Sequence, residues 1–184
     1  MMVAVAGPNG AGKSTFYDAF LPNTGLHFVN ADVLSLSLQL EPYQAPKLAD
    51  TLRRELVQRR ESFIFETVFS DPVGEKLQFM KETQAAGYTV LLVFIGVEDS
   101  EASDTRVAMR AAGGGHDVPS EKIRRRFPRV MHNLQRALAE LDNVRVYDNS
   151  DLANPYRLVA VKESGVPFKI NKPVPAWLQP LLPK

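Results

Sequence analysis

Cysteine is absent from this 184-residue chain. Its absence excludes disulfide scaffolds, zinc–thiolate sites, iron–sulfur clusters and cysteine nucleophiles. An excess of charge of one sign is lacking too, because 22 lysine and arginine residues are matched by 21 aspartate and glutamate residues. Such a balance gives no general basic field for duplex nucleic acid and argues against a nucleic-acid partner.

Long hydrophobic runs are also missing. The longest apolar run covers residues 88–97, whereas a membrane-spanning helix needs roughly 20 residues. Residues 1–7 place no basic segment before their apolar positions, which is not the pattern of a signal peptide. We therefore expect no membrane partner and a cytoplasmic location.

Short β-rich segments alternate with longer helical patterns along the chain. The expected strands are 3–6, 27–30, 63–66, 89–95 and 144–147, and the expected helices are 13–20, 45–60, 72–86, 100–111 and 120–141. Parallel strands need long crossovers, which are usually helical. The alternation thus predicts a three-layer α/β domain with a five-stranded parallel sheet, of the P-loop, nucleoside-kinase-like type.

Two features qualify this outline. Ser120 is placed to cap the last helix, and Pro128 is expected to kink or divide it. From residue 167 onward prolines are frequent, which argues against regular helix. We expect one kinase-like domain over residues 1–166 and a proline-rich tail, 167–184, packed on the same domain.

Residues 7–14 read GPNGAGKS and match the complete P-loop pattern. The motif follows a β-rich run and opens a helix, where backbone N–H groups and the helix dipole hold phosphate anions. Lys13 would reach the β and γ phosphates, and Ser14 would ligate Mg²⁺. The predicted cofactors are ATP and Mg²⁺, and the predicted nucleotide-binding residues are Gly7, Pro8, Asn9, Gly10, Ala11, Gly12, Lys13, Ser14 and Thr15.

The rest of the sequence narrows the class of P-loop protein. A guanine-selecting NKxD motif is missing, because the pair Asn171–Lys172 is followed by Pro173 and Val174. The LSGGQ-like signature of transporter ATPases is missing too. Small kinases remain, and in these catalysis consists mainly of placing the acceptor hydroxyl and neutralising charge on the transferring phosphoryl group.

Acidic residues at the ends of two expected strands are candidates for that work. Asp32 follows the second strand, at the edge where ligands collect in open α/β sheets, and could accept the acceptor's proton; it could equally be a helix N-cap. Glu66 ends the third strand and could hold a metal-bound water or a substrate hydroxyl, with Thr67 beside it. An exposed strand end is the alternative for Glu66.

Residues 106–129 have the composition of a lid, with two arginine-bearing helices flanking a glycine-rich connector. Arg126 borders the apolar stripe of its helix whereas Arg125 is expected to point nearly opposite, so Arg110 and Arg126 are the predicted phosphate-facing pair. His116, in the connector, could orient the lid or contact substrate. A solvated basic face or a nucleic-acid patch is the alternative for these arginines.

Taken in order, the segments GPNGAGKST, FVNAD, FETVFSDP, GGGHDVP with the following IRRRFPR, and VYDNS resemble the zeta toxin family of P-loop kinases over about residues 3–150. The resemblance implies an ATP- and Mg²⁺-dependent kinase that phosphorylates the 3′-hydroxyl of UDP-N-acetylglucosamine. It implies Asp32 as general base, Lys13 as P-loop lysine, and an antitoxin protein as a partner. Asn149 would lie near the adenine.

These observations lead to two hypotheses. The first is a small-molecule kinase whose acceptor is UDP-N-acetylglucosamine or a related sugar nucleotide, with Ser14 and Glu66 at the metal and Arg110 and Arg126 over the γ phosphate. The second is an ATP-gated binding module that engages a protein or RNA partner through its basic lid helix.

Overall fold

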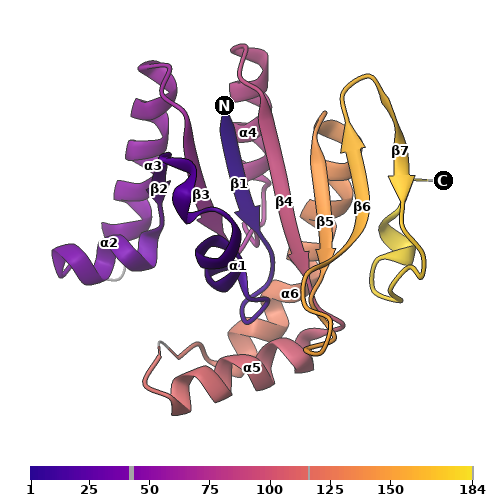
Figure 1. Ribbon diagram of the computed structural model, residues 1–184. Coiled ribbons are helices and arrows are strands. Elements are labelled where there is room, and N and C mark those ends of the chain that lie inside the picture. The colour runs from indigo at the N-terminus through magenta and orange to yellow at the C-terminus, as the bar shows by residue number, and fades with distance from the viewer. Residues whose placement is uncertain (42–43, 116, 184) are drawn as a thin grey trace.

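The computed structural model describes residues 1–41, 44–115 and 117–183. A seven-stranded sheet with the order β2-β3-β1-β4-β5-β6-β7 forms its centre (Figure 1). The strands are β1 (Met2–Ala6), β2 (His27–Val29), β3 (Phe63–Thr67), β4 (Val90–Gly96), β5 (Val144–Asp148), β6 (Arg157–Glu163) and β7 (Val166–Ile170). The helices are α1 (Lys13–Phe20), α2 (Ala31–Leu38), α3 (Gln44–Gln58), α4 (Glu75–Ala85), α5 (Ser100–Ala112) and α6 (Ser120–Glu140), with short 3-10 helices η1 (Pro22–Thr24) and η2 (Gln179–Leu181).

The α/β fold is confirmed, and the five expected strands form the parallel part of the sheet. The expected strand number is wrong, because β6 and β7 add an antiparallel hairpin beside β5. Gly165, with φ of 75°, allows the tight turn between these two strands. Pro167 lies within β7, the last strand of the sheet, where a missing N–H is tolerated because no further strand pairs with that edge.

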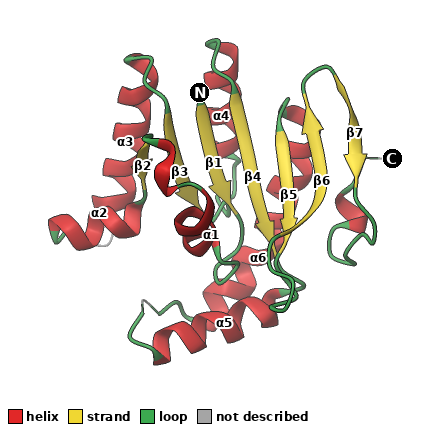
Figure 2. Ribbon diagram, viewed as in Figure 1, coloured by secondary structure: helices red, strands yellow, loops and turns green. Residues whose placement is uncertain are grey.

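Alternate residues of the strands face two apolar layers. Met2 and Ala4 of β1 belong to the larger core, which α3, α4 and α6 cover, whereas Val3 and Val5 face α1. Figure 2 shows α1 on one side of the sheet and α3 and α4 on the other. The parallel strands end at one common edge, where α1 begins and α5 crosses below the sheet (Figure 1). This edge is where ligands bind in open α/β sheets.

Several helix boundaries differ from the sequence-based expectation. Helix α2 was anticipated only in the alternative that makes Asp32 a helix N-cap, and Pro128 does not divide α6, which continues to Glu140. The buried stripe that includes Val130, Leu134 and Leu138 packs the part of α6 after the proline into the larger core, whereas Ile123 before it is buried in a separate small cluster with Val107 and Val118. Ser120 is the first residue of α6 rather than its cap, and Pro119 occupies the N-cap position.

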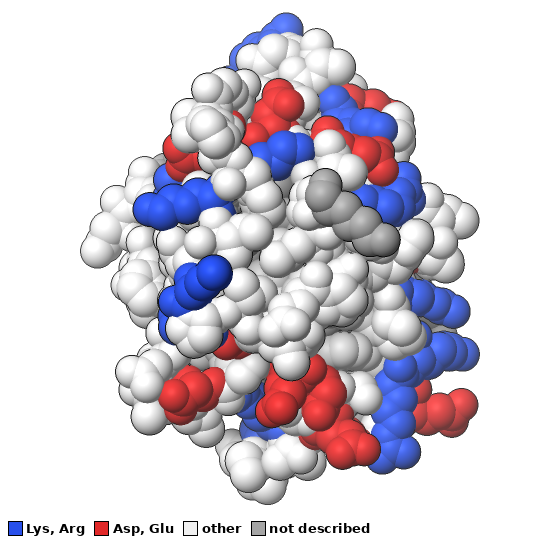
Figure 3. All heavy atoms as spheres, turned by 90° about the vertical axis from the view of Figure 1, so that its right-hand side faces the viewer, with Lys and Arg blue, Asp and Glu red and all other residues white. Residues whose placement is uncertain are grey.

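The predicted tail begins inside β7 and then packs along the sheet. Leu178 is fully buried in the larger core, and the Trp177 indole donates a hydrogen bond to Asp148 Oδ1 across 3.0 Å. Seen from the side of β7, the surface carries acidic and basic groups toward its two ends and is largely uncharged between them (Figure 3). In the described ranges, none of the helices has the length and apolar character needed to cross a membrane.

Candidate active site

Glycines at two positions give the P-loop its close turns. Gly7 has a φ of 150°, and a Cβ there would collide with the backbone oxygen of Ile95. Gly12, with a φ of 89°, ends the loop just before α1, and its Cβ would come within 2.8 Å of both Asn149 Nδ2 and Tyr156 Oη. Both positions therefore require glycine, and the loop enters α1 with its backbone N–H groups available for phosphate.

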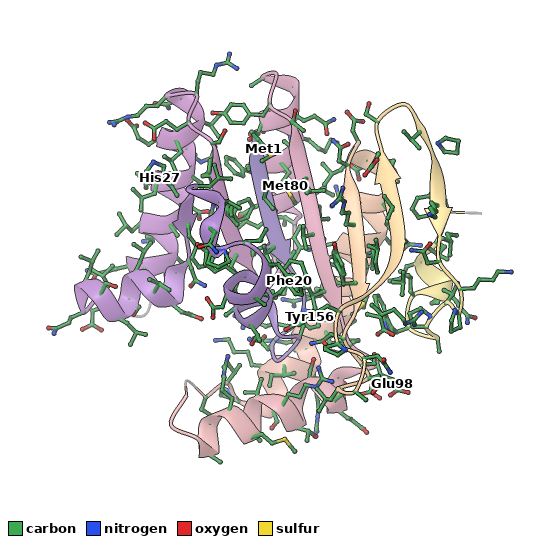
Figure 4. All side chains as sticks on the ribbon, viewed as in Figure 1. Met1, Phe20, His27, Met80, Glu98 and Tyr156 are labelled. Carbon is green, nitrogen blue, oxygen red and sulfur yellow. The ribbon has the colours of Figure 1, made fainter. Side chains whose placement is uncertain are left out.

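Residues far along the chain hold the P-loop from outside. Asn149 Nδ2 donates to the carbonyl of Ala11 and Tyr156 Oη donates to the carbonyl of Gly12, each across 2.9 Å. The Tyr156 ring also packs against Phe20 of α1, with ring centroids 5.8 Å apart (Figure 4). Asn149 thus supports the phosphate loop directly. Sequence reasoning missed Tyr156, because no motif marks it and its partner lies 144 positions away.

Lys13 is buried inside the loop, where its ammonium donates to the carbonyl of Pro8 across 2.9 Å. Burial lowers the pKa of Lys13, and the carboxylates of Glu66 and Asp32 partly offset that effect by attraction. The guanidinium groups of Arg110 and Arg126 repel the ammonium and add to the lowering of this pKa. All four charges therefore lie within electrostatic reach of the P-loop lysine.

Glu66 is the centre of a hydrogen-bond network at the tip of β3. Its Oε2 accepts from Ser14 Oγ and from Asn30 Nδ2, each across 2.9 Å, and its Oε1 lies 3.9 Å from Lys13 Nζ. Parallel pairing of β1 with β3 sets Val5 beside Glu66 and so brings the strand end next to the loop. Asn30 is a second residue that sequence reasoning missed.

These contacts fit a magnesium ion that is shared with nucleotide phosphates. Because the Ser14 hydroxyl donates its hydrogen bond to Glu66, the lone pairs of its oxygen remain for a metal. Within the described part of the chain, no group of three or more His, Asp or Glu side chains is placed to hold a metal ion alone. Mg²⁺ usually needs only one or two protein ligands when phosphates and water supply the rest.

Asp32 lies exposed in the first turn of α2, directly after β2. The cap of α2 is Asn30, whose Oδ1 accepts from the backbone N–H groups of Asp32 and Val33 at 2.7 and 3.3 Å. The alternative interpretation of Asp32 as the helix cap is therefore wrong. Its carboxylate is close enough to Lys13 for its charge to act on the pKa of that ammonium.

The predicted lid arginines come from two helices. Arg110 lies in the last turn of α5 and Arg126 in the first half of α6. Arg125 is exposed, in agreement with its expected place away from the apolar stripe, but it lines the same hollow as Arg126 and Arg129 and so lies beside the predicted site. Burial and the repulsion of Arg125 and Arg129 lower the pKa of Arg126. His116 lies outside the described residues.

The family model described as Zeta toxin matches residues 30–158. The chain belongs to the Zeta toxin family. That span contains Asp32, Glu66, Arg110 and Arg126, while the P-loop precedes it. No curated protein sequence matches this Zeta toxin family chain.

Solved structures with the same fold are more distant. The AvrRxo1-ORF1:AvrRxo1-ORF2 complex with sulphate ions matches with a TM-score of 0.73 at 19% identity, over 94% of this chain and 61% of that chain. The same complex has been solved with ATP, and it matches with a TM-score of 0.71 at 20% identity, over 93% and 60% of the two chains. The PezAT toxin–antitoxin system of Streptococcus pneumoniae matches with a TM-score of 0.58 at 19% identity, over 80% and 68%. This Zeta toxin family chain thus shares their fold and spans about three fifths of the AvrRxo1 complex chain.

Proposed function

We propose that this chain is an ATP-dependent kinase that transfers the γ phosphate to a hydroxyl group of a small molecule. The proposed acceptor is UDP-N-acetylglucosamine or a related sugar nucleotide, and the proposed cofactors are ATP and Mg²⁺. Membership of the Zeta toxin family supports a phosphotransferase. The cytoplasm, where ATP is made, is the compartment in which such an enzyme would work.

The convergence of charges on Lys13 carries this proposal. Two carboxylates, Glu66 and Asp32, and two guanidinium groups, Arg110 and Arg126, act on the buried ammonium of the P-loop. They come from β3, α2, α5 and α6, and charges from four separate segments that all act on the P-loop lysine support a site for a terminal phosphate beside it. A glycine turn with a merely solvated lysine would show neither the burial nor the surrounding charges.

The chemistry follows from this arrangement. The acceptor oxygen forms a bond to the γ phosphorus while the bond from that phosphorus to the β–γ bridging oxygen breaks, which leaves ADP. Asp32 orients the acceptor hydroxyl and takes its proton. Lys13, Arg110 and Arg126 neutralise the charge that moves through the phosphoryl group. A magnesium ion on Ser14, with Glu66 behind it, would supply further charge neutralisation at the β and γ phosphates.

An antitoxin partner is part of the same proposal. PezAT is a toxin–antitoxin system, and the AvrRxo1 structures are of a complex between two proteins. Their likeness to this chain supports a search for a protein that binds over the nucleotide site. Loss of ATP binding when such a protein is added would be the expected sign.

The test is incubation with Mg-ATP and a panel of nucleotide sugars, nucleosides and free sugars, followed by phosphorus NMR. A new phosphomonoester resonance is expected with the nucleotide sugars. Asp32→Asn should keep ATP binding and lose turnover by about 100-fold or more, because the acceptor proton has no destination. Asp142→Asn, an exposed change at the opposite end of the strands, is the control. Wild-type turnover in Asp32→Asn would remove Asp32 from the chemistry.

The crowding of cations on α6 favours a second candidate, the ATP-gated module with a protein or RNA partner. Arg125 cannot test it separately, because it lines the hollow beside the site. Arg124 can, since it is 65% exposed and lies 3.6 Å from Asp104 of α5. Arg124→Glu should spare phosphoryl transfer. Two results together would favour the binding module over the kinase. The wild-type chain would form ADP from ATP without any phosphomonoester product, and Arg124→Glu would no longer bind a partner that the wild-type chain binds.

A further inference from the structure

An apolar pocket of about 390 Å³ lies between α1 and the face of the sheet that this helix covers. Helix α1 has eight residues and is about 12 Å long, whereas the seven residues of β4 extend over about 23 Å. A helix of this length cannot cover the whole strand, which leaves room for a pocket on this face. None of the described residues that line it is a proposed catalytic side chain.

The walls of the pocket are mainly hydrocarbon. The sheet contributes Val3, Leu91 and Val93, and α1 contributes Phe16 and Phe20. The Phe20 side chain is 59% exposed, although it borders a concave apolar site. An apolar molecule in the pocket would remove this surface from water, and the volume lies within the range of roughly 300–1,000 Å³ that is usual for small-molecule sites.

Four aromatic rings form a continuous cluster in the wall. The Phe16 ring centroid lies 4.8 Å from that of Phe20, 5.1 Å from that of Tyr147 and 5.3 Å from that of Tyr156. Phe20 and Tyr156 lie side by side at one end of this cluster (Figure 4). Aromatic rings attract one another in edge-to-face and offset arrangements. A flat aromatic group therefore fits this wall better than a flexible aliphatic chain does.

Arg145 of β5 gives the pocket its charge. Among the described residues of the lining, it has the one charged side chain, and no carboxylate is present there. Arg145 pairs with Val93 in the register of β4 and β5, so both face the pocket. Its Nη2 contacts Glu163 Oε1 at 3.1 Å, which engages one of the five N–H donors of the guanidinium. An acidic group on a bound molecule would pair with this cation.

Tyr156 connects the pocket to the P-loop. Its ring lines the pocket, while its hydroxyl donates to the carbonyl of Gly12 across 2.9 Å. The backbone of Tyr156 has a φ of 56°, a conformation that a bulky residue keeps only where its surroundings enforce it. A molecule that packs against the ring would hold the hydroxyl at Gly12. Occupancy of the pocket would thereby stabilise the loop that binds phosphate.

We propose that this pocket is a regulatory site for a small aromatic acid, whose binding strengthens the affinity of the P-loop for its nucleotide. The rings of Phe16, Phe20 and Tyr156 hold the aromatic group. Arg145 pairs with the acid, and the bond from Tyr156 to Gly12 transmits occupancy to the loop. The coupling is reciprocal, so a nucleotide tightens the binding of the acid by the same factor. Only this coupling rests on the proposed ATP site.

Two fluorescent probes test the pocket. The first is 8-anilinonaphthalene-1-sulfonate, an aromatic acid, and the second is N-phenyl-1-naphthylamine, which has the same rings without the sulfonate. Arg145→Gln should weaken binding of the sulfonate about fivefold or more and leave binding of the uncharged probe within about twofold. Phe20→Ala should weaken both, because a ring of the wall is lost.

The matched control for Arg145 is Arg59→Gln. It breaks an exposed pair between Arg59 and Glu55 of α3, on the other face of the sheet, and should change neither affinity. Thermal unfolding within about 3 °C of wild type shows that each variant is folded. If Arg145→Gln binds the sulfonate as tightly as wild type, the assignment of the pocket to an acid is overturned.

Calorimetric titration with a non-hydrolysable Mg-ATP analogue measures the coupling. Saturating sulfonate should lower the Kd of the analogue about fivefold. Tyr156→Phe should still bind the sulfonate within about twofold of wild type but lose the coupling, because the hydroxyl that reaches Gly12 is gone. An unchanged Kd in the wild-type chain overturns the regulatory role. Displacement of the sulfonate by the analogue would place the probe on the P-loop and overturns the pocket as well.

The remaining outcomes separate this inference from the kinase proposal. A chain that binds no nucleotide contradicts the ATP site and the regulation, whereas sulfonate binding that depends on Arg145 still supports the site for an aromatic acid. Transfer of phosphate without any effect of the sulfonate leaves the kinase standing and overturns the regulation. A dimer that the sulfonate dissociates and Phe20→Ala abolishes, measured by analytical ultracentrifugation, would make a second copy of the chain the occupant and overturns the proposal.

Discussion

The hydroxyl of Ser14 donates to Glu66 across 2.9 Å and joins the P-loop to the tip of β3, 52 positions further along the chain. The first turn of α1 and the end of β3 are thereby joined before any ligand binds. Asn30 completes the arrangement from the end of β2. Nucleotide, metal and acceptor would meet at this junction of three strand ends.

Replacement of Glu66 by glutamine should lower turnover by about 100-fold or more. The amide oxygen can still accept from Ser14 and Asn30, but the NH2 group then faces the Lys13 ammonium, and the charge that offsets the burial of Lys13 is lost. Steady-state kinetics over a range of Mg²⁺ concentrations should show a higher requirement for the metal. Glu163→Gln, at an exposed position of β6, is the control. If turnover of Glu66→Gln is within twofold of wild type, Glu66 has no role in holding the metal or the phosphates.

The clamp on the P-loop can be tested through Asn149. Asn149→Ala removes the donor to the Ala11 carbonyl and should weaken ATP binding about tenfold, since a buried acceptor loses its partner. Tyr156→Phe removes the bond to Gly12 and should have a smaller effect. Fluorescent ATP analogues give both affinities, and Asn154→Ala is the exposed control. Unchanged affinity in both variants would show that the loop keeps its shape without the clamp.

Glycine substitutions separate backbone strain from crowding. Gly12 and Gly25 both have positive φ, 89° and 67°, but a Cβ at Gly12 meets Asn149 and Tyr156 whereas one at Gly25 meets nothing within 4 Å. Gly25→Ala should cost about 1–2 kcal/mol of unfolding free energy and leave ATP binding intact. Gly12→Ala should abolish ATP binding. If Gly12→Ala and Gly25→Ala have equal effects on unfolding free energy and on ATP binding, then Asn149 and Tyr156 move aside to accept the Cβ at position 12.

Acid should release the C-terminal segment at Asp148. Burial alone would raise the pKa of Asp148, but hydrogen bonds from Ser150, Trp177 and Arg157 outweigh it and lower this pKa below the ordinary aspartate value. The stabilisation is therefore complete above about pH 4 and is lost as pH falls through the lowered pKa. Trp177 is the chain's single tryptophan, so its fluorescence reports the change.

Two variants test whether Asp148 is the group that titrates. In Asp148→Asn the emission of Trp177 should already be altered at pH 7, and the acid transition should disappear. Asp142→Asn, at an exposed position outside the cluster, should keep it. An acid transition that persists in Asp148→Asn would place the titrating group elsewhere.

Contiguous patterns made much of this structure predictable. The P-loop is a continuous motif, and β1 and α1 lie on either side of it within one residue of the expected bounds. Glu66 could be identified because an acid at the end of an apolar strand is seldom a packing residue. Its hydrogen bonds to Ser14 and Asn30 agree with that reasoning, whereas the metal role that was assigned to it stays a prediction.

Relations between distant segments were beyond the reach of the sequence. The apolar stripe of α6 predicts which side chains face the core, but it does not predict which segments lie beside the helix. In the structure the loop after β3 lies beside Arg125, and both line the same hollow. Pro167 concealed β7, because a proline argues against a strand unless the strand is known to be at an edge. Asn30, although it lies within the FVNAD segment, and Tyr156, which no motif marks, act through partners more than 30 positions away.

The construction of α6 limits how the protein can move around a nucleotide. Its second half is embedded in the interior through Val130, Leu134 and Leu138, and the first half is continuous with it across Pro128. Val107 of α5 is buried together with Ile123 in that first half, so α5 is held to the same helix. Arg110 and Arg126 thus belong to one packed pair of helices that a single continuous helix anchors in the core.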